Sequence, residues 1–177
     1  MKLIYPKIKG LKIIKSTVFR DKRGFLRETY QKKIVGKNDF PFDVMSFSKK
    51  GVLRGLHIQT KNSQAKIITV THGKIFDVAV DLRKGSNTFG KYFSCVLSER
   101  NFKSLYIPAG FAHGFMTLDK ENYVLYSCTK YRNLKSEKSI KFNDRDFKIK
   151  WPFKNPIISK RDTVAMGFAE YKNKNFK

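Results

Sequence analysis

The three histidines of this sequence are the side chains best suited to acid–base chemistry, because imidazole titrates near neutral pH. His57 stands in the strand-like run 51–59, where strict alternation places it on the same face as Gln59 and on the face opposite to Arg54. A lone histidine in a strand is more often a satisfied structural residue than a base. The polar neighbours of His57 shift that balance towards a functional role.

The other two histidines carry weaker signals. His113 lies in Pro108-x-Gly110-x-x-His113, a turn that enters an aromatic strand, and a buried, hydrogen-bonded histidine is its ordinary interpretation. His72 precedes Gly73 in a turn, so we expect an exposed side chain without a role.

Short strands are the elements that would position these histidines. Turn signals recur at close spacing between runs that alternate or are rich in β-branched residues, a pattern typical of a β-sandwich or barrel. The apolar run 74–82 is nearly continuous, so we expect both faces of that strand to be covered. No stretch has helical apolar spacing over more than about three turns. We expect one all-β domain over 1–177 with a frayed tail from 172 to 177, and strands near 12–19, 25–30, 66–71, 74–82, 89–97, 103–107 and 123–131.

Positive charge dominates the 177 residues, with 38 Lys and Arg against 14 Asp and Glu and a formal net charge of +24 at pH 7. Such a surplus normally favours nucleic acid as the partner, because phosphate neutralisation dominates that affinity. Here it is spread along the whole chain and comes mostly from lysine, whereas nucleic-acid recognition leans on arginine. We expect a solvated surface that attracts an anionic small substrate and no specific nucleic-acid partner. A basic nucleic-acid-binding module is the alternative from another class.

The cysteines and the distribution of charges also indicate a compartment. Cys95 and Cys128 form no CxxC pair, which favours two reduced, buried thiols. The longest stretch without Lys, Arg, Asp or Glu, 104–118, is shorter than a membrane span. Lysines near the N-terminus interrupt the apolar core of any signal peptide. We expect a cytoplasmic protein with no membrane segment.

The Pro108-x-Gly110-x-x-His113 spacing resembles the second sequence motif of cupin jelly rolls. Metal-binding cupins carry a His-x-His pair in the first motif, whereas this chain reads His57-Ile58-Gln59. A catalytic metal needs three protein ligands beside an open position. Two candidate histidines without a suitably spaced glutamate disfavour a metal site, and we expect none. A metal-dependent cupin is the second alternative function, beside the nucleic-acid-binding module.

Six segments in a fixed order, 18–28, 48–59, 73–83, 107–115, 143–144 with 151–152, and 158–162, carry a closer resemblance that covers nearly the whole chain. In these segments the chain resembles the dTDP-4-dehydrorhamnose 3,5-epimerases. The resemblance implies a cupin-type double-stranded β-helix (jelly roll) with short peripheral helices. It also implies inversion of C3 and C5 of dTDP-4-dehydro-6-deoxy-D-glucose, giving dTDP-4-dehydro-L-rhamnose for dTDP-L-rhamnose biosynthesis. No cofactor is needed, because the C4 ketone already acidifies its neighbours.

The resemblance implies roles for four residues. Inversion requires a base on one face of the sugar, an acid on the other and a group that holds the enolate charge. His57 matches the family's base, and Asp162 matches the carboxylate that orients it. Tyr126 matches the proton donor on the far face, and Lys66 matches the cation near the C4 oxygen.

A second set of residues matches positions that line the family's substrate pocket. Arg23, Glu28, Arg54 and His113 belong to it, and arginine suits the oxygens of a diphosphate. Tyr131 and Phe19 are stacking or packing candidates for the nucleotide. The resemblance further implies a homodimer in which the partner's N-terminal strands help to complete each pocket.

One stretch departs from the family pattern. Where many members read Gln-Asp-Asn, a variable residue and Ser, this chain reads Phe42-Asp43-Val44-Met45-Ser46. Two amides that would touch the substrate are replaced by apolar side chains. The nucleotide, the sugar and the inversion of both centres therefore stay open, and the nearest alternative is a 3-epimerase or a 3,5-epimerase acting on another nucleotide-linked 4-keto-6-deoxy sugar.

Overall fold

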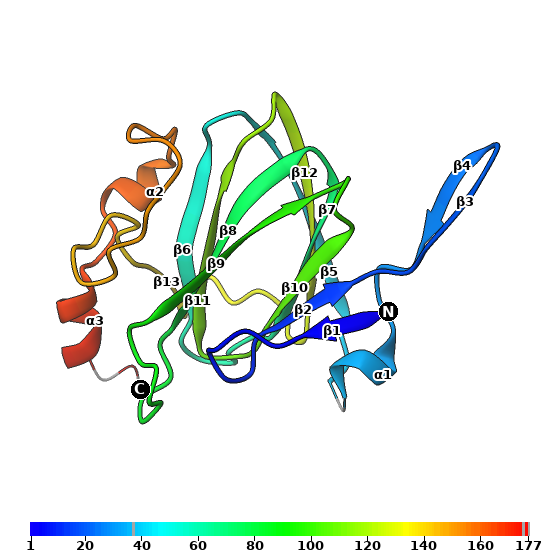
Figure 1. Ribbon diagram of the computed structural model, residues 1–177. Coiled ribbons are helices and arrows are strands. Elements are labelled where there is room, and N and C mark those ends of the chain that lie inside the picture. Colours follow the sequence, from blue (N-terminus) through cyan, green and yellow to red (C-terminus); the bar gives the residue numbers. More distant parts are fainter. Residues whose placement is uncertain (37, 175, 177) are drawn as a thin grey trace.

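The computed structural model describes residues 1–36, 38–174 and 176, and it is dominated by β-strands (Figure 1). The predicted all-β class is confirmed. The strands are β1 (Lys2–Ile4), β2 (Lys12–Lys15), β3 (Val18–Asp21), β4 (Gly24–Arg27), β5 (Phe42–Lys49), β6 (Leu53–Gln59), β7 (Lys66–His72), β8 (Lys74–Asp81), β9 (Tyr92–Ser98), β10 (Lys103–Ile107), β11 (Phe111–Thr117), β12 (Glu121–Cys128) and β13 (Glu137–Ser139), and the helices are α1 (Lys32–Val35), α2 (Lys160–Thr163) and α3 (Phe168–Asn173).

Two antiparallel sheets face one another and enclose the main core. One has the strand order β1-β2-β10-β7-β12-β5, and the other has the order β13-β6-β11-β8-β9. The core between them includes Ile68 and Val124 from the first sheet and Ile75, Ala79 and Phe115 from the second. Burial of this apolar surface is the main force that holds the two layers together.

Strand β8 is covered on both faces, as its continuous apolar run predicts. Ile75 and Ala79 point into the core between the sheets, whereas Val78 and Val80 belong to a second apolar cluster. That second cluster contains Phe147 and Phe168 of the C-terminal segment. The C-terminal segment, with α2 and α3, thus forms an outer layer over the five-stranded sheet (Figure 1).

Several strand boundaries differ from the sequence-based expectation. The predicted strand 12–19 is two strands, because the Ser16 N–H bonds to the carbonyl of Phe102 at 3.0 Å and the chain then leaves the sheet for the hairpin β3–β4. Strand β5 was not predicted. It is an edge strand with exposed and polar positions, so its apolar signal is weak.

The segment expected to be a frayed tail is partly ordered. Lys172 and Asn173 end helix α3, and the ring of Phe176 lies 5.0 Å from that of Tyr171. Residues 175 and 177 lie outside the described residues.

The hairpin β3–β4 projects away from the body of the molecule (Figure 1). It contacts the rest of the chain through Phe25 of β4, which packs edge-on against Phe102 with the ring centroids 5.2 Å apart. Phe19 and Leu26 remain 57% and 64% exposed. An apolar arm of this kind is a surface that a second protein chain can cover.

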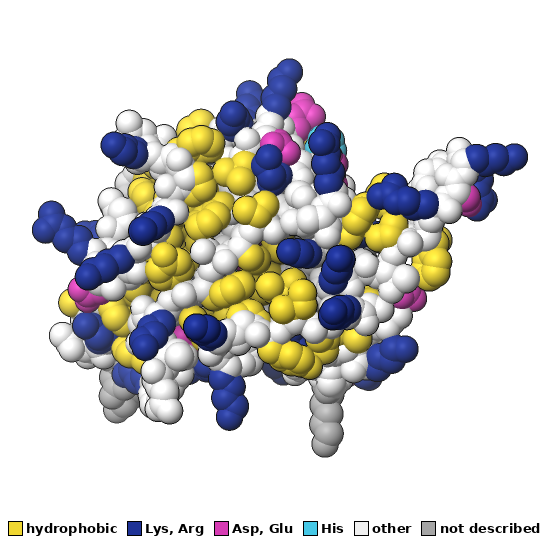
Figure 2. All heavy atoms as spheres, viewed as in Figure 1, with side chains coloured by type: hydrophobic (Ala, Val, Ile, Leu, Met, Phe, Trp, Pro, Cys, Tyr) yellow, Lys and Arg dark blue, Asp and Glu magenta, His cyan; other side chains and the backbone are white. Residues whose placement is uncertain are grey.

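Basic side chains are scattered over the molecular face in Figure 2 rather than gathered into one stripe. This distribution agrees with the even spread of lysine along the sequence. Among the described residues, no helix is both long and apolar enough to cross a membrane.

Candidate active site

A cavity of about 500 Å³ opens between the two sheets and collects most of the predicted site residues. Arg54 and His113 line it. So do the four residues to which the resemblance gives catalytic roles, namely His57, Lys66, Tyr126 and Asp162. They come from four different elements, β6, β7, β12 and α2. The two facing sheets bring His57, Lys66 and Tyr126 together, and the C-terminal segment packed on the five-stranded sheet adds Asp162.

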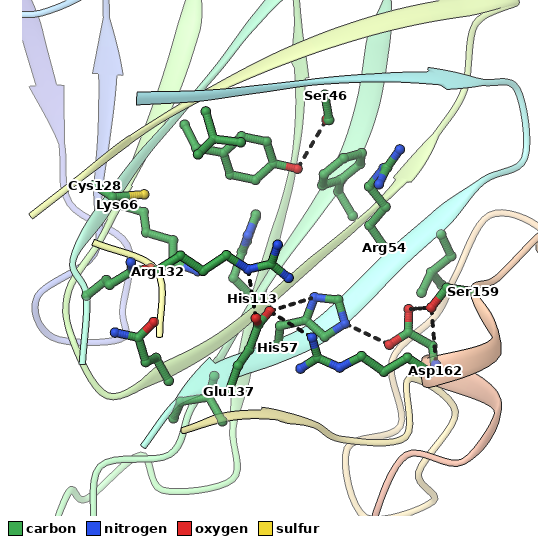
Figure 3. A pocket seen from close by; sticks show the side chains of 18 of the residues that line it. Ser46, Arg54, His57, Lys66, His113, Cys128, Arg132, Glu137, Ser159 and Asp162 are labelled. Atoms are coloured by element: carbon green, nitrogen blue, oxygen red, sulfur yellow. Dashed lines mark hydrogen bonds and ion pairs between the residues drawn. The ribbon is translucent and has the colours of Figure 1, made fainter. Parts of the chain in front are cut away.

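His57 and Asp162 form a hydrogen-bonded pair on one wall. The Nε2 atom of His57 lies 2.7 Å from Oδ1 of Asp162, which is buried (Figure 3). Ser139 and Ser159 donate hydroxyl hydrogen bonds to the same carboxylate at 3.1 and 2.9 Å. Burial alone would raise the pKa of Asp162, but the bonds from His57 and the two serines outweigh it and hold that pKa below its usual value. Asp162 is therefore a carboxylate at neutral pH.

Helix α2 explains how Asp162 reaches this position. Ser159 caps the helix, because its hydroxyl accepts a bond from the Asp162 backbone N–H at 3.2 Å. The same hydroxyl donates to the Asp162 side chain. One serine thus starts the helix and fixes the carboxylate that holds His57.

Glu137 lies on the other side of the His57 ring and was missed by the sequence analysis. Its Oε1 is 3.9 Å from Nδ1 of His57 and 3.2 Å from Nη1 of Arg161, and its Oε2 accepts a bond from Nε of Arg132 at 2.9 Å. Burial would raise the pKa of Glu137, but Arg132 and Arg161 together lower it. Glu137 faces Gln59 across the β6–β13 pair, a proximity that only the folded sheet reveals.

Tyr126 stands on the opposite sheet from His57, in β12. Its phenol oxygen lies 3.3 Å from the Ser46 hydroxyl, and its ring meets His113 edge-on with centroids 6.1 Å apart. Burial raises the pKa of Tyr126, so the phenol stays protonated at neutral pH. A protonated phenol can serve as an acid on the wall facing the base.

Lys66 begins β7 and lines the same cavity, paired across the sheet with Cys128. Burial lowers the pKa of Lys66. An ammonium group deprived of water interacts strongly with any negative charge that develops beside it.

The structure corrects the predicted orientation of Arg54. The pairing of β6 with β11 shifts register between His57, opposite His113, and Arg54, opposite Phe115. Gly55 and Leu56 of β6 therefore lie opposite the single residue Gly114 of β11, and Arg54 lines the cavity with His57 instead of pointing to the other face. Arg54 is held there by bonds from Nε to the Ser48 hydroxyl at 2.9 Å and from Nη2 to the Phe47 carbonyl at 3.0 Å.

His113 is buried, as expected, and it also borders the cavity. Its Nε2 lies 2.8 Å from Oδ2 of Asp77, which is fully buried in β8. His72 is exposed and pairs with Glu99 at 2.8 Å, outside the cavity.

Four predicted substrate-binding residues do not line the cavity of their own chain. Phe19 and Arg23 lie on the projecting hairpin, where Arg23 pairs with Asp21 and is 84% exposed. Glu28 follows the hairpin and accepts a bond from Gln31 at 2.7 Å. Tyr131 is exposed, but its ring packs 5.5 Å from that of Phe42, which does line the cavity.

A histidine held by a buried carboxylate faces a protonated phenol across the cavity, with a lysine lining the same cavity, and this arrangement suits the epimerisation of a carbohydrate. Residues 6–170 match the model of the dTDP-4-dehydrorhamnose 3,5-epimerase family. The chain belongs to that family.

Individual relatives agree with this assignment. The dTDP-4-dehydrorhamnose 3,5-epimerase of Salmonella typhimurium is 43% identical over 172 residues, 93% of this chain and 94% of the relative. That of Neisseria gonorrhoeae is 42% identical over 96% of this chain, which spans only 53% of that longer relative.

Solved structures show the same fold. The dTDP-4-dehydrorhamnose 3,5-epimerase of Elizabethkingia anophelis has a TM-score of 0.91 at 43% identity, covering 96% of this chain and 97% of its own. The Legionella pneumophila epimerase in complex with dTDP-4-keto-L-rhamnose has a TM-score of 0.90 at 40% identity, covering 93% and 91%. A 3'-monoepimerase of Streptomyces bikiniensis in complex with dTDP-quinovose has a TM-score of 0.88 at 28% identity, covering 94% and 88%. The predicted cupin-type jelly roll is confirmed.

Proposed function

We propose that this chain inverts C3 and C5 of dTDP-4-dehydro-6-deoxy-D-glucose and so produces dTDP-4-dehydro-L-rhamnose. The observation that carries the proposal is the placement of His57 and Tyr126 on opposite sheets of one cavity. Inversion needs a proton removed from one face of the sugar and a proton returned to the other.

The contacts of His57 support its role as the base. Asp162 occupies Nε2, so Nδ1 is the nitrogen that can take the proton from the carbon next to the ketone. The electron pair of the broken C–H bond forms a double bond between that sugar carbon and C4, and the C4 oxygen becomes an enolate oxygen. Lys66 is the cation that stabilises this oxygen.

Tyr126 completes the inversion by giving its phenolic proton to the same carbon from the opposite face. After one inversion His57 has gained a proton and Tyr126 has lost one. Proton exchange with water restores both groups, and the second centre is inverted by the same steps. Arg54, Arg132 and Arg161 provide the positive charge that a diphosphate needs.

Heavy water provides the direct test. Incubation with dTDP-4-dehydro-6-deoxy-D-glucose should place deuterium at both C3 and C5, and the variant His57→Asn should place none. The matched control is His72→Asn, which alters an exposed histidine outside the cavity and should exchange normally. Absence of deuterium at either carbon with the native protein would refute the proposal. Deuterium at C3 alone would assign a 3-epimerase, the alternative that the apolar Phe42 and Val44 leave open.

We further propose a homodimer in which the hairpin β3–β4 of one chain reaches the cavity of the other. Two observations support this arrangement: Phe19 and Leu26 are exposed, and no residue of the hairpin lines the cavity of its own chain. It would deliver Phe19, Arg23 and Glu28 to the site where the family resemblance needs them.

Mixing two inactive variants tests the exchange. His57→Asn and Arg23→Ala should each lose activity, whereas a refolded equal mixture should regain about a quarter of the native activity, because half the dimers would hold one intact pocket. No regain, or full activity of Arg23→Ala alone, would exclude shared pockets.

We also propose that the chain forms one domain in the cytoplasm. The free thiols of Cys95 and Cys128 suit a reducing compartment.

A further inference from the structure

The inner face of β5 presents mainly carbon to the cavity beside Tyr126. Phe42, Val44 and Ser46 line the cavity, while Met45 between them is 62% exposed on the other face. Ser46 already lies 3.3 Å from the Tyr126 phenol. Between Ser46 and the ring of Tyr131, which packs on Phe42, the side chains that β5 turns to the cavity therefore carry no hydrogen-bond donor or acceptor.

This surface lies directly beside the proposed acid. Val44 is the cross-strand partner of Tyr126, and Phe42 is the partner of Cys128. The part of a sugar that lies next to the carbon receiving the Tyr126 proton must therefore lie near Val44.

The wall across the cavity has the opposite character. Glu137, Arg132, Arg161 and Ser159 line it near His57. The Nη2 atom of Arg161 is buried without a hydrogen-bond partner among the described residues, so it is a donor that a ligand oxygen could satisfy. Sugar hydroxyls find partners on this wall and find none at the side chains of Phe42 and Val44.

A hydroxyl buried against Phe42 and Val44 would lose its water without gaining a hydrogen bond, which is unfavourable. A methyl group in the same place would gain from leaving water. We infer that Phe42 and Val44 determine specificity by binding the deoxygenated edge of the sugar, the one that bears the C6 methyl group. This inference rests on the proposed function.

Two stable ligands isolate the effect, because dTDP-6-deoxy-D-glucose and dTDP-D-glucose differ only in the C6 hydroxyl and neither has the ketone needed for turnover. Titration calorimetry should show the 6-deoxy ligand binding about 10- to 100-fold more tightly to the native protein, the range by which an apolar pocket rejects an added hydroxyl. Val44→Asn offers an amide to that hydroxyl and should reduce the preference to a few-fold or less, while the Kd of dTDP alone stays unchanged.

Met45→Asn is the matched control, since it makes a similar change on the outer face of the same strand and should keep the native preference. Phe42→Gln is a second test on the inner face, to be used if Val44→Asn does not fold. It should also reduce the preference for the 6-deoxy ligand. Equal affinities of the native protein for both ligands, or an equal loss of preference in Met45→Asn, would overturn the inference. If the specificity inference is overturned while deuterium still enters C3 and C5, the epimerase proposal stands. If the native protein binds neither dTDP nor either dTDP-sugar, the epimerase proposal and the specificity inference are both rejected.

Discussion

The Nε2 atom of His57 lies 2.7 Å from Oδ1 of Asp162, although 105 positions separate the two residues in the chain. The Asp162 carboxylate fixes the orientation of the His57 ring and places the ring proton on Nε2. Nδ1 is thereby turned towards Glu137, which is itself bound by two arginines. The His57 ring is thus positioned from both sides before any substrate enters.

Removal of the charge on Asp162 should disable this base. We expect Asp162→Asn to lower kcat by about 10²- to 10⁴-fold with little change in KM, because the amide can donate to Nε2 and leave the proton-accepting role of Nδ1 unsupported. Steady-state kinetics measure both constants. Asp146→Asn, on the exposed surface, serves as the control. An unchanged kcat in Asp162→Asn would remove Asp162 from the mechanism.

Tyr126→Phe should separate proton removal from proton return. His57 can still form the enolate, and the proton can go back to the face from which it came. We expect deuterium from heavy water in recovered substrate, with inversion reduced by about 10²-fold or more. Nuclear magnetic resonance distinguishes the two outcomes. Tyr123→Phe is the control, since Tyr123 packs against Phe47 and His72 away from the cavity; normal inversion by Tyr126→Phe would require another acid.

Lys66→Met should reveal the stabilisation of the enolate. Loss of one preorganised group at a developing oxyanion lowers kcat by about 10²- to 10³-fold, and we expect a value in that range. The control is Lys61→Met, at an exposed lysine of the preceding loop. If the two variants were equally active in steady-state assays, Lys66 would have no role at the C4 oxygen.

Asp81 makes stability depend on pH. It is fully buried and accepts bonds from Arg83 at 2.7 and 2.9 Å and from the Ser86 and Thr88 hydroxyls at 2.6 Å each. Burial would raise the pKa of Asp81, but these bonds lower it far below its usual value. Because the folded pKa is lower than the unfolded one, the stabilisation is complete above about pH 5 and is lost as pH falls through the acid range.

Asp81→Asn should therefore reduce the free energy of unfolding by about 3 kcal/mol at pH 7 and by much less near pH 2. Urea unfolding at several pH values measures the difference. Asp39→Asn, at an exposed ion pair, should change it little at any pH. A pH-independent loss in Asp81→Asn would show that the charge of Asp81 contributes nothing.

The local pattern of apolar residues and turns predicts the all-β class and several of the strands. The run 74–82 indicates a strand covered on both faces, and β8 is such a strand. Long-range pairing explains what local pattern misses. Glu137 reaches His57 only because β13 pairs with β6, and Arg54 faces the cavity only because of a register shift between β6 and β11. Neither event leaves a signal in neighbouring residues.

The position of α2 has a consequence for the order of folding. Asp162 belongs to the C-terminal layer, whereas His57 belongs to a strand formed from the first third of the chain. Contacts between such distant segments form slowly, because a long loop must close first. Enzymatic activity is thus a late reporter of folding. In a refolding experiment we expect β-sheet circular dichroism to recover before turnover, with the interval set by docking of the C-terminal segment.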